Sequence, residues 1–245
     1  MTFRSVWQWG ITRKILEGDF PNDGIRFPKD TEKPPFQTWK EIERQISRGG
    51  MTDNQQADLW DCLFLTLDEI DGALKHVKES ATQPFVYPMF VMAAQTGARR
   101  SELMRSQLTD FDEQAVLLRE RKRVRGKRSF RRVPLSDSLK AVLKAWFENH
   151  PGGRYTFCKS TFGDAVPLTR DDASGYFERT LRDSNWSVIP GWHCFRHSFI
   201  SNCAMKGVDQ RIIDTWVGHQ TEEMRRRYRH LFPDTEQAAM KSVFS

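Results

Sequence analysis

Helix-start signals recur along this 245-residue sequence and divide it into separate helical segments. Thr-x-x-Glu capping boxes begin at Thr38 and Thr66, where the hydroxyl and the carboxylate satisfy backbone N–H groups of a first helical turn. Ser136, Thr169 and Thr221 are further N-cap candidates, because a side-chain oxygen at that position accepts a hydrogen bond from the next turn. The sequence therefore predicts a mainly helical chain.

Two more helices and one pair of strands complete the predicted architecture. Pro84–Ala94 is apolar and predicts a buried helix, and the glycines of Gly207–Gly218 bracket a shorter one. Val116–Arg121 and Phe130–Leu135 have the composition of strands and lie on either side of a turn at Gly126. We therefore expect an α+β fold, mainly α, with one small antiparallel sheet.

The N-terminal segment differs from the rest of the chain. Met1–Leu16 carries apolar residues spaced for one face of a helix, which ends near Gly18. Pro21–Pro35 is rich in Pro, Asp, Lys and Gly, which is typical of a linker or an irregular segment. The sequence predicts a single short helix followed by a connection.

The composition argues against a membrane protein. Hydrophobic residues make up 38% of the chain, and no apolar run approaches the ~20 residues of a membrane-spanning helix. Met1–Gly18 mixes Trp with Arg, Lys and Glu, unlike a signal peptide. We expect a cytoplasmic protein.

The four cysteines show no C-x-x-C spacing, which in such a protein favours buried or idle thiols. Cys194 and Cys203 lie near His193 and His197, but their spacing does not match zinc-binding patterns. We expect neither a metal nor a cofactor.

Positive charge is concentrated in the C-terminal two thirds of the chain. Residues 1–80 hold 11 Lys and Arg against 14 Asp and Glu, whereas residues 81–245 hold 27 against 18. Nine of the fourteen residues from Arg119 to Arg132 are Lys or Arg, and only Glu120 opposes them. A solvated hairpin is one explanation, but so many neighbouring cations repel one another unless a polyanion neutralises them. Nucleic acid is the favoured partner.

Three separated clusters carry the residue types of phosphoryl-transfer chemistry. The first is Thr96–Leu103, with the sequence TGARRSEL; the second is His193–Ser198, with HCFRHS; the third is Gly218-His219, followed nine residues later by Tyr228. Each cluster alone has an ordinary structural explanation, such as a surface charge, a core histidine or a basic helix face. Together they supply arginines, histidines and a tyrosine in one chain.

Three motifs resemble, in order and rough spacing, the signatures of the tyrosine recombinases, or phage integrases. They are T-G-x-R-x-S-E-L, H-x-x-R-H, and G-H with a tyrosine nine residues on. The resemblance covers about residues 38–235. It implies a helical catalytic domain with a small β-sheet, related to type IB topoisomerases. It also implies site-specific cleavage and rejoining of DNA strands, in the context of mobile genetic elements.

The resemblance assigns a role to each motif residue. Arg99 and Arg196 would hold the non-bridging phosphate oxygens, which gain negative charge during attack. His193 and His219 would add hydrogen bonds and assist proton transfer. Tyr228 would attack the phosphate, form a 3′-phosphotyrosine and release a 5′-hydroxyl. The phosphotyrosine keeps the bond energy, so neither ATP nor a metal is required.

In this family a lysine of the β-hairpin protonates the leaving 5′-oxygen. Lys122, where the first strand ends, is the preferred candidate, and Lys127, just after the turn glycine, is the alternative. The adjacent Arg100 and His197 are not favoured, because successive side chains on a helix point about 100° apart. Glu102 is predicted to hold Arg99 or a cap. The expected DNA-contacting residues are Arg121, Arg123, Arg125, Lys127, Arg128, Arg225 and Arg227.

The resemblance also suggests a domain organisation. Residues 1–19 resemble the last helix of an N-terminal core-binding domain that is otherwise missing, residues 20–37 would be the linker, and residues 38–245 the catalytic domain. A chain of this kind is expected to bind double-stranded DNA weakly, as a monomer in solution and a tetramer on DNA. Glu236–Phe244 could form a helix that docks on a neighbouring protomer or packs on its own domain.

Two other functions remain open at this point. The chain could be a catalytically idle DNA-binding remnant of an integrase, or a type IB topoisomerase-like relaxase with the same chemistry and no recombination. Covalent chemistry separates the first from an enzyme, and strand exchange between two sites separates the second from a recombinase.

Overall fold

The computed structural model describes residues 3–21, 34–124, 127–161, 164–218 and 221–232, and for residues 121–124, 127–128 and 161 it describes the backbone alone. The chain divides into two compact units, Met1–Lys33 and Pro34–Ser245. The predicted helix at 236–244 lies outside the described residues. Within those residues, no helix is long and apolar enough to cross a membrane.

The first unit holds one helix, α1 (Phe3–Thr12), which is shorter than the predicted Met1–Leu16. Lys14 adopts a left-handed backbone conformation, φ 56°, which breaks the helix. The chain then turns back, so that the Trp7 indole donates a hydrogen bond of 3.2 Å to the carbonyl of Gly18. Trp7 also packs edge-on against Phe20, with 5.8 Å between ring centroids.

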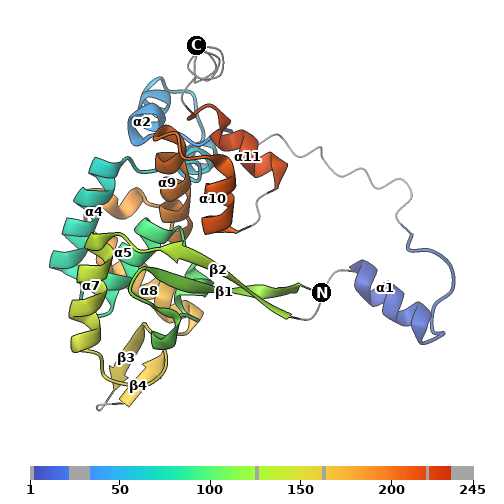
Figure 1. The fold of residues 1–245 in the computed structure, drawn as a ribbon. Helices are drawn as coiled ribbons and strands as arrows, with labels where there is room; N and C mark the ends of the chain where they lie inside the picture. The colour runs from blue at the N-terminus through green and yellow to red at the C-terminus, as the bar shows by residue number, and fades with distance from the viewer. Residues whose placement is uncertain (1–2, 22–33, 125–126, 162–163, 219–220, 233–245) are drawn as a thin grey trace, which may run out of the picture. The chain divides into compact units, whose positions relative to one another are not determined.

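The second unit is mainly helical (Figure 1). Its α-helices are α2 (Trp39–Ser47), α3 (Asp53–Trp60), α4 (Leu67–Ser80), α5 (Val86–Thr96), α6 (Arg100–Leu103), α7 (Asp137–Glu148), α8 (Arg170–Leu181), α9 (Trp192–Met205), α10 (Gln210–Val217) and α11 (Glu222–Arg229). Two 3-10 turns, Leu108–Asp110 and Asn185–Val188, lie between them.

The predicted helix starts are confirmed. The side chains of Thr38 and Thr66 accept hydrogen bonds from Glu41 and Glu69 in complete capping boxes, and those of Ser136, Thr169 and Thr221 cap α7, α8 and α11. Sequence analysis missed α3, although Thr52 and Gln55 form the same capping box in front of it.

Two small antiparallel sheets accompany the helices. Strands β1 (Ala115–Val124) and β2 (Lys127–Pro134) form the predicted hairpin. Its register runs from Ala115 opposite Pro134 to Arg119 opposite Phe130, then shifts before Arg123. A second hairpin, β3 (Cys158–Thr161) and β4 (Asp164–Pro167), was not predicted. The fold class, mainly α with small antiparallel sheets, is confirmed.

The core is built around α5 and α9. Helix α5 packs against α4, α7 and α9, and most of its residues are buried. Trp192 is buried at the start of α9 and donates through its indole to the carbonyl of Ala173. A smaller apolar cluster, which includes Phe36, Ile213 and Tyr228, lies at the other end of α9. Helix α9 therefore connects the main core with the cluster that holds Tyr228.

Candidate active site

Arg99 stands at a sharp turn between α5 and α6. Gly97 ends α5 in the left-handed conformation, φ 60°, and a side chain there would approach the Phe199 ring to 2.8 Å. Both observations explain the glycine of the first motif. Arg99 follows as the N-cap of α6 with about a third of its side chain exposed. The turn therefore presents a guanidinium at the surface on a well-defined backbone.

Glu102 holds Arg99, as predicted. Its carboxylate accepts a hydrogen bond of 2.9 Å from Arg99 Nη1 and one of 2.7 Å from the Arg99 backbone N–H. The same carboxylate pairs with the buried guanidinium of Arg131, which reaches it from β2. Burial alone would raise the pKa of Glu102, but Arg131 and the hydrogen bonds from Arg99 outweigh it and lower the pKa. Glu102 is thus a charged, buried residue that fixes the position of Arg99, the catalytic candidate.

Arg131 was not singled out in the sequence, where it lies within the basic tract. Only 5% of its side chain is exposed, and its Nη1 donates to the carbonyl of Trp216 at 2.6 Å. Arg131 and Val133 are both buried on β2 while Phe130 and Arg132 are exposed. This period-two alternation is the signal that could have identified Arg131 as an inward-facing residue.

Arg196 lies deep in the fold. Its guanidinium donates to the carbonyl of Gly97 at 2.8 Å and to that of Val217 at 2.6 Å, so it ties α9 to the ends of α5 and α10. Burial, together with the charges of Arg99 and Arg131, lowers the pKa of Arg196 to about 9. The side chain remains a cation at neutral pH.

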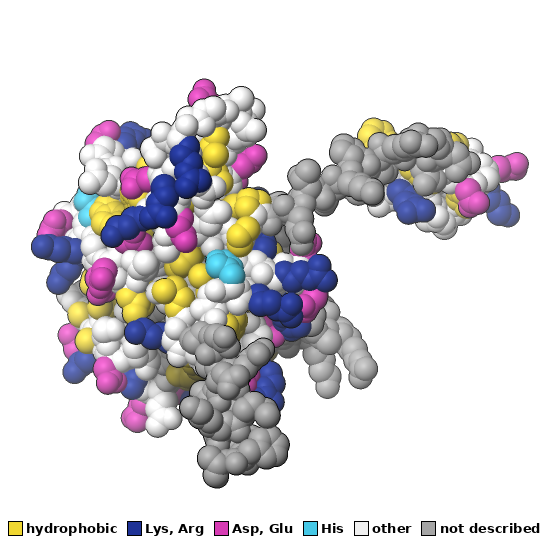
Figure 2. Space-filling view, turned by 90° about the horizontal axis from the view of Figure 1, so that it is seen from above, with side chains coloured by type: hydrophobic (Ala, Val, Ile, Leu, Met, Phe, Trp, Pro, Cys, Tyr) yellow, Lys and Arg dark blue, Asp and Glu magenta, His cyan; other side chains and the backbone are white. Residues whose placement is uncertain are grey.

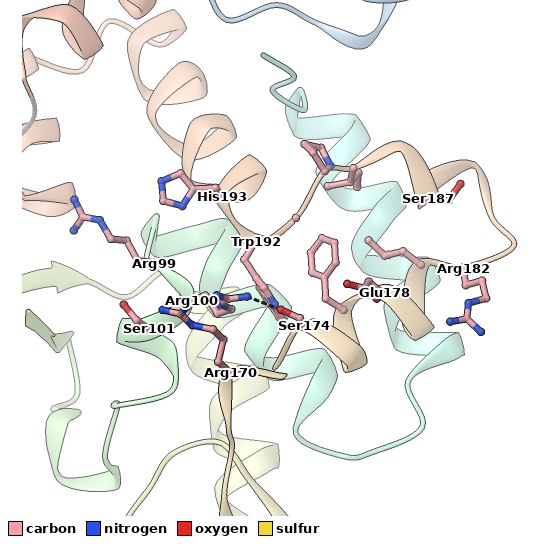
Figure 3. Close-up of a pocket in the computed structure, with 15 residues that line it drawn as sticks. Arg99, Arg100, Ser101, Arg170, Ser174, Glu178, Arg182, Ser187, Trp192 and His193 are labelled. Atoms are coloured by element: carbon pink, nitrogen blue, oxygen red, sulfur yellow. Dashed lines mark hydrogen bonds between the residues drawn. The ribbon is translucent and has the colours of Figure 1, made fainter. Parts of the chain in front are cut away.

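His193 lies one helical turn before Arg196 and His197, and its side chain is exposed. It lines a hollow of about 660 Å³ together with Arg99, and Figure 3 shows the two side chains on the same side of it. Neighbouring groups partly desolvate the ring, which lowers the pKa of His193, and the charges of Arg196 and Arg99 lower it further. A neutral imidazole can accept or donate a proton there.

Tyr228 is fully buried, with 0% of its surface exposed. Its hydroxyl shares a hydrogen bond of 2.7 Å with Nδ1 of His197, from the helix that carries His193 and Arg196. Burial raises the pKa of the phenol, although Arg196 and Arg227 oppose this effect. Burial likewise lowers the pKa of His197, and its proximity to His193 and the charges of Arg227 and Arg196 lower it further. Sequence analysis did not anticipate this contact of His197, because only the fold brings α9 and α11 together.

Residues 34–37 cover Tyr228. The Phe36 ring stacks on Tyr228 at 4.6 Å and on His197 at 4.1 Å between centroids. The guanidinium of Arg227 lies over the same ring at 3.8 Å and donates to the carbonyl of Pro34 at 2.9 Å. We call residues 34–37 the strap. Its Phe36 ring packs against both Tyr228 and His197, and the phenol is fully buried.

The neutral, buried His197 predicts a loss of stability at mildly acid pH. The unfolded chain has an ordinary histidine pKa of about 6.5, whereas the folded pKa lies well below it. Below pH ~6.5 the unfolded state therefore binds more protons, and the free energy of unfolding falls by up to about 1.4 kcal/mol per pH unit. His193 acts in the same direction.

Urea unfolding followed from about pH 8 to about pH 5 tests this expectation. His197→Asn keeps a polar atom near the position of Nδ1 and cannot titrate, so its stability should fall less steeply below pH ~6.5. His230→Asn, at an exposed histidine, should leave the slope unchanged. The same slope in all three proteins would contradict the role assigned to His197.

The remaining predicted residues divide into two groups. Arg225 forms ion pairs with Asp214 at 2.7 Å and Glu222 at 3.5 Å, and Arg227 contacts the strap. Both arginines therefore already have partners within the protein. The other residues have no described side chain: the backbones of Arg121, Lys122 and Arg123 lie on β1, those of Lys127 and Arg128 lie on β2, and Arg125 and His219 lie outside the described residues.

Sequence comparison gives a family match. The model of the phage integrase family matches residues 63–234. Transposase B from transposon PsiTn554 of Staphylococcus aureus is 28% identical over 113 residues, which are 42% of this chain and 18% of that protein. A probable integrase/recombinase of Aquifex aeolicus is 24% identical over 214 residues, which are 80% of this chain and 65% of that protein. The chain thus spans less than two thirds of either relative.

Solved structures share the fold. The Tn1549 transposon integrase in complex with transposon right end DNA superimposes with a TM-score of 0.62 at 16% identity, covering 99% of this chain and 77% of that one. The XerH site-specific recombinase in a post-cleavage complex gives 0.53 at 19%, covering 74% and 52%. The catalytic domain of bacteriophage HP1 integrase gives 0.50 at 23%, covering 73% and 93%. With the family match over residues 63–234, these likenesses show that the chain belongs to the phage integrase family and has the fold of a tyrosine recombinase catalytic domain.

Proposed function

We propose that this chain is a site-specific DNA recombinase that cleaves and rejoins strands through a 3′-phosphotyrosine on Tyr228. The observation that carries the proposal is the arrangement along α9. This one helix sets His193 beside Arg99 at the surface, Arg196 beneath them, and His197 against the Tyr228 hydroxyl. Helix α9 thus contacts both the candidate nucleophile, which lies on α11, and the turn before α6 that carries Arg99.

The electrostatics fit a phosphodiester substrate. Attack on phosphorus builds negative charge on the non-bridging oxygens, and preformed guanidiniums stabilise that charge without reorganising. Arg99 is exposed enough to reach a bound phosphate, and Glu102 fixes its direction. Arg196, buried and tied to two carbonyls, contributes positive charge at close range. His193 supplies a hydrogen-bond donor in the same hollow.

The proposed reaction has two matching transfers. The Tyr228 oxygen attacks phosphorus, the phenolic proton passes to His193 or His219 as general base, and the bond from phosphorus to the 5′-oxygen breaks. A hairpin lysine, Lys122 with Lys127 as the alternative, protonates that oxygen to a 5′-hydroxyl. A second 5′-hydroxyl then attacks the phosphotyrosine, which restores the DNA strand and frees Tyr228. His219 would assist proton transfer.

The described structure holds Tyr228 away from this reaction. Its hydroxyl is buried and its pKa is raised, so the phenol is protonated and solvent cannot reach it. Cleavage therefore requires Tyr228 to leave the contact with His197 and Phe36 and to approach the phosphate at Arg99. The Tyr228 phenol therefore becomes reactive only when bound DNA brings its hydroxyl and the phosphate at Arg99 together.

The test is covalent capture on nicked suicide DNA substrates taken from sequence flanking the gene. The full chain should give an SDS-resistant protein–DNA band, and Tyr228→Phe should abolish it. Tyr87→Phe, which removes the hydroxyl of a tyrosine whose ring lies beneath the Lys78 ammonium, should keep the band. Rejoining between two different sites would then separate a recombinase from a relaxase.

An absent band has a defined meaning only if DNA is bound. The same substrates should therefore be examined for binding, with a relative's N-terminal domain fused before Met1 if the chain alone binds too weakly. Tight binding without any covalent adduct would overturn the proposal and favour a catalytically idle DNA-binding protein.

A further inference from the structure

The hollow beside Arg99 and His193 is larger than the site of one phosphate requires. Figure 3 shows Arg99 and His193 on one side of it, Arg182 and Ser187 on the far side, and Arg100 and Arg170 between them. Its wall comes from the start of α6, from α8 and from the segment that leads into α9. The hollow is therefore a trough that begins at the candidate active site and continues across α8.

Positive charge dominates this trough. Four arginines line it, Arg99, Arg100, Arg170 and Arg182, and Glu178 is the acidic residue among its lining. Arg100 donates to the hydroxyl of Ser174, a neutral partner. Among the described residues, no carboxylate forms an ion pair with Arg100, Arg170 or Arg182. Three of the four guanidiniums, all except that of Arg99, thus lack an ion-pair partner among the described residues.

A second hollow, of about 340 Å³, adjoins the first. It shares Arg100, Ser101 and Arg170 with the trough and adds Arg105, whose Nη2 donates to the carbonyl of Arg119 on β1. No acidic side chain lines it. The basic surface therefore extends from the trough toward the β1–β2 hairpin, past the C-terminal end of α6.

The distribution of charge is different on the face that carries α2 and α11. That face, seen from above in Figure 2, mixes Lys and Arg with Asp, Glu and hydrophobic side chains. There, Arg225 of α11 forms ion pairs with Asp214 and Glu222. Within the described part of the chain, Arg100, Arg170 and Arg182 of the trough form no such ion pair.

We propose that the trough binds the DNA backbone next to the cleaved phosphate, with Arg170 and Arg182 each contacting a phosphate group. The inference rests on the proposed function, because a strand whose phosphate lies at Arg99 and His193 continues from there with one negative charge per nucleotide. Guanidiniums without protein partners bind such phosphates in bidentate geometry. Contacts of this kind position the DNA and do not read its sequence.

Arg100 has a different part in this arrangement. Its bond to Ser174 joins α6 to α8, so it fixes the trough relative to Arg99. Arg170 and Arg182 are exposed, and their removal should leave the fold intact. These two residues are therefore the informative ones to substitute.

The test compares salt-dependent DNA binding of full-length variants, all in a Tyr228→Phe background that prevents cleavage. Fluorescence anisotropy with a duplex should show that Arg170→Ala and Arg182→Ala each weaken binding to all sequences alike. Each should also lower the slope of log K against log salt by about 0.9, the value for one lost phosphate contact. Arg179→Ala is the matched control, since Arg179 lies on α8, stacks on Tyr176 and does not line the trough.

The outcomes separate the two proposals. Lower slopes for both trough variants, with a parental slope for Arg179→Ala, support the inference. Unchanged slopes for Arg170→Ala and Arg182→Ala overturn it, even if the parent with Tyr228 intact forms a covalent adduct and so supports the proposed function. Lower slopes together with a parent that never forms an adduct would keep the trough as a DNA site and overturn strand cleavage.

Discussion

Glu102→Gln is expected to lower the free energy of unfolding by about 3–5 kcal/mol, the usual effect of removing one partner of a buried ion pair. The carboxylate is 1% exposed and faces the guanidinium of Arg131, which is 5% exposed. Without it, the one carboxylate that pairs with Arg131 in the described part of the chain is that of Glu120, 3.8 Å from its Nε. Urea unfolding at neutral pH measures the difference.

The matched control is Asp112→Asn. Asp112, just before β1, pairs at 3.0 Å with Arg132, the neighbour of Arg131 on β2, but both side chains are more than half exposed. Water screens that pair, so the substitution should cost far less stability than Glu102→Gln. Equal losses for the buried and the exposed pair would contradict the anchoring role of Glu102.

A double variant sharpens the result. Arg131→Gln combined with Glu102→Gln removes the charge that the single substitution leaves buried, so the two losses should not add. Arg99 loses its carboxylate partner in either protein that carries Glu102→Gln. Covalent capture of DNA should therefore remain impaired in the double variant even where stability recovers, which separates the two roles of Glu102.

The sequence predicted those parts of the fold that depend on neighbouring residues. Capping at Thr38 or Thr221 involves residues within one helical turn, and the β1–β2 hairpin is specified by its own alternation and turn. Glu102 was recognised as the partner of Arg99 for the same reason, because the two are three residues apart. Short-range interactions of this kind can be read without knowing the tertiary structure.

Contacts between distant segments could not be predicted in this way. Arg131 is one of many cations in its tract, and the sequence did not indicate that its guanidinium is buried against Glu102 of α6. His197 and Tyr228 are 31 residues apart and meet because α9 and α11 pack together. Each of these residues appeared in the sequence as an ordinary example of its type.

The strap shows how composition can mislead. Pro34–Gln37 follows a stretch rich in Pro, Lys and Asp, and the whole of residues 20–37 was assigned to a linker. In the structure, Phe36 is fully buried, Gln37 pairs with Leu63, and the compact second unit begins at Pro34. The apolar residue within the polar segment was the available signal.

Phe36→Ala is expected to destabilise the protein and yet to make Tyr228 more reactive. Removing a fully buried phenylalanine costs about 3–5 kcal/mol of unfolding free energy, and it also removes the ring that stacks on Tyr228 and His197. Solvent and DNA then reach the phenol more easily, and the burial that raises its pKa is reduced. Adduct formation on suicide DNA should therefore be faster per molecule of folded, DNA-bound protein.

Phe157→Ala provides the matched control, because Phe157 is equally buried but belongs to the main core rather than to the cluster around Tyr228. It should cost a similar free energy of unfolding without increasing adduct formation. Both variants must be assayed at a temperature at which urea curves show them folded. Slower capture in both would mean that stability alone controls the reaction, whereas faster capture confined to Phe36→Ala would mean that displacement of the strap precedes cleavage. Because Arg227 of α11, the nucleophile's own helix, holds the strap, the first residues of the second unit would then also control access to Tyr228.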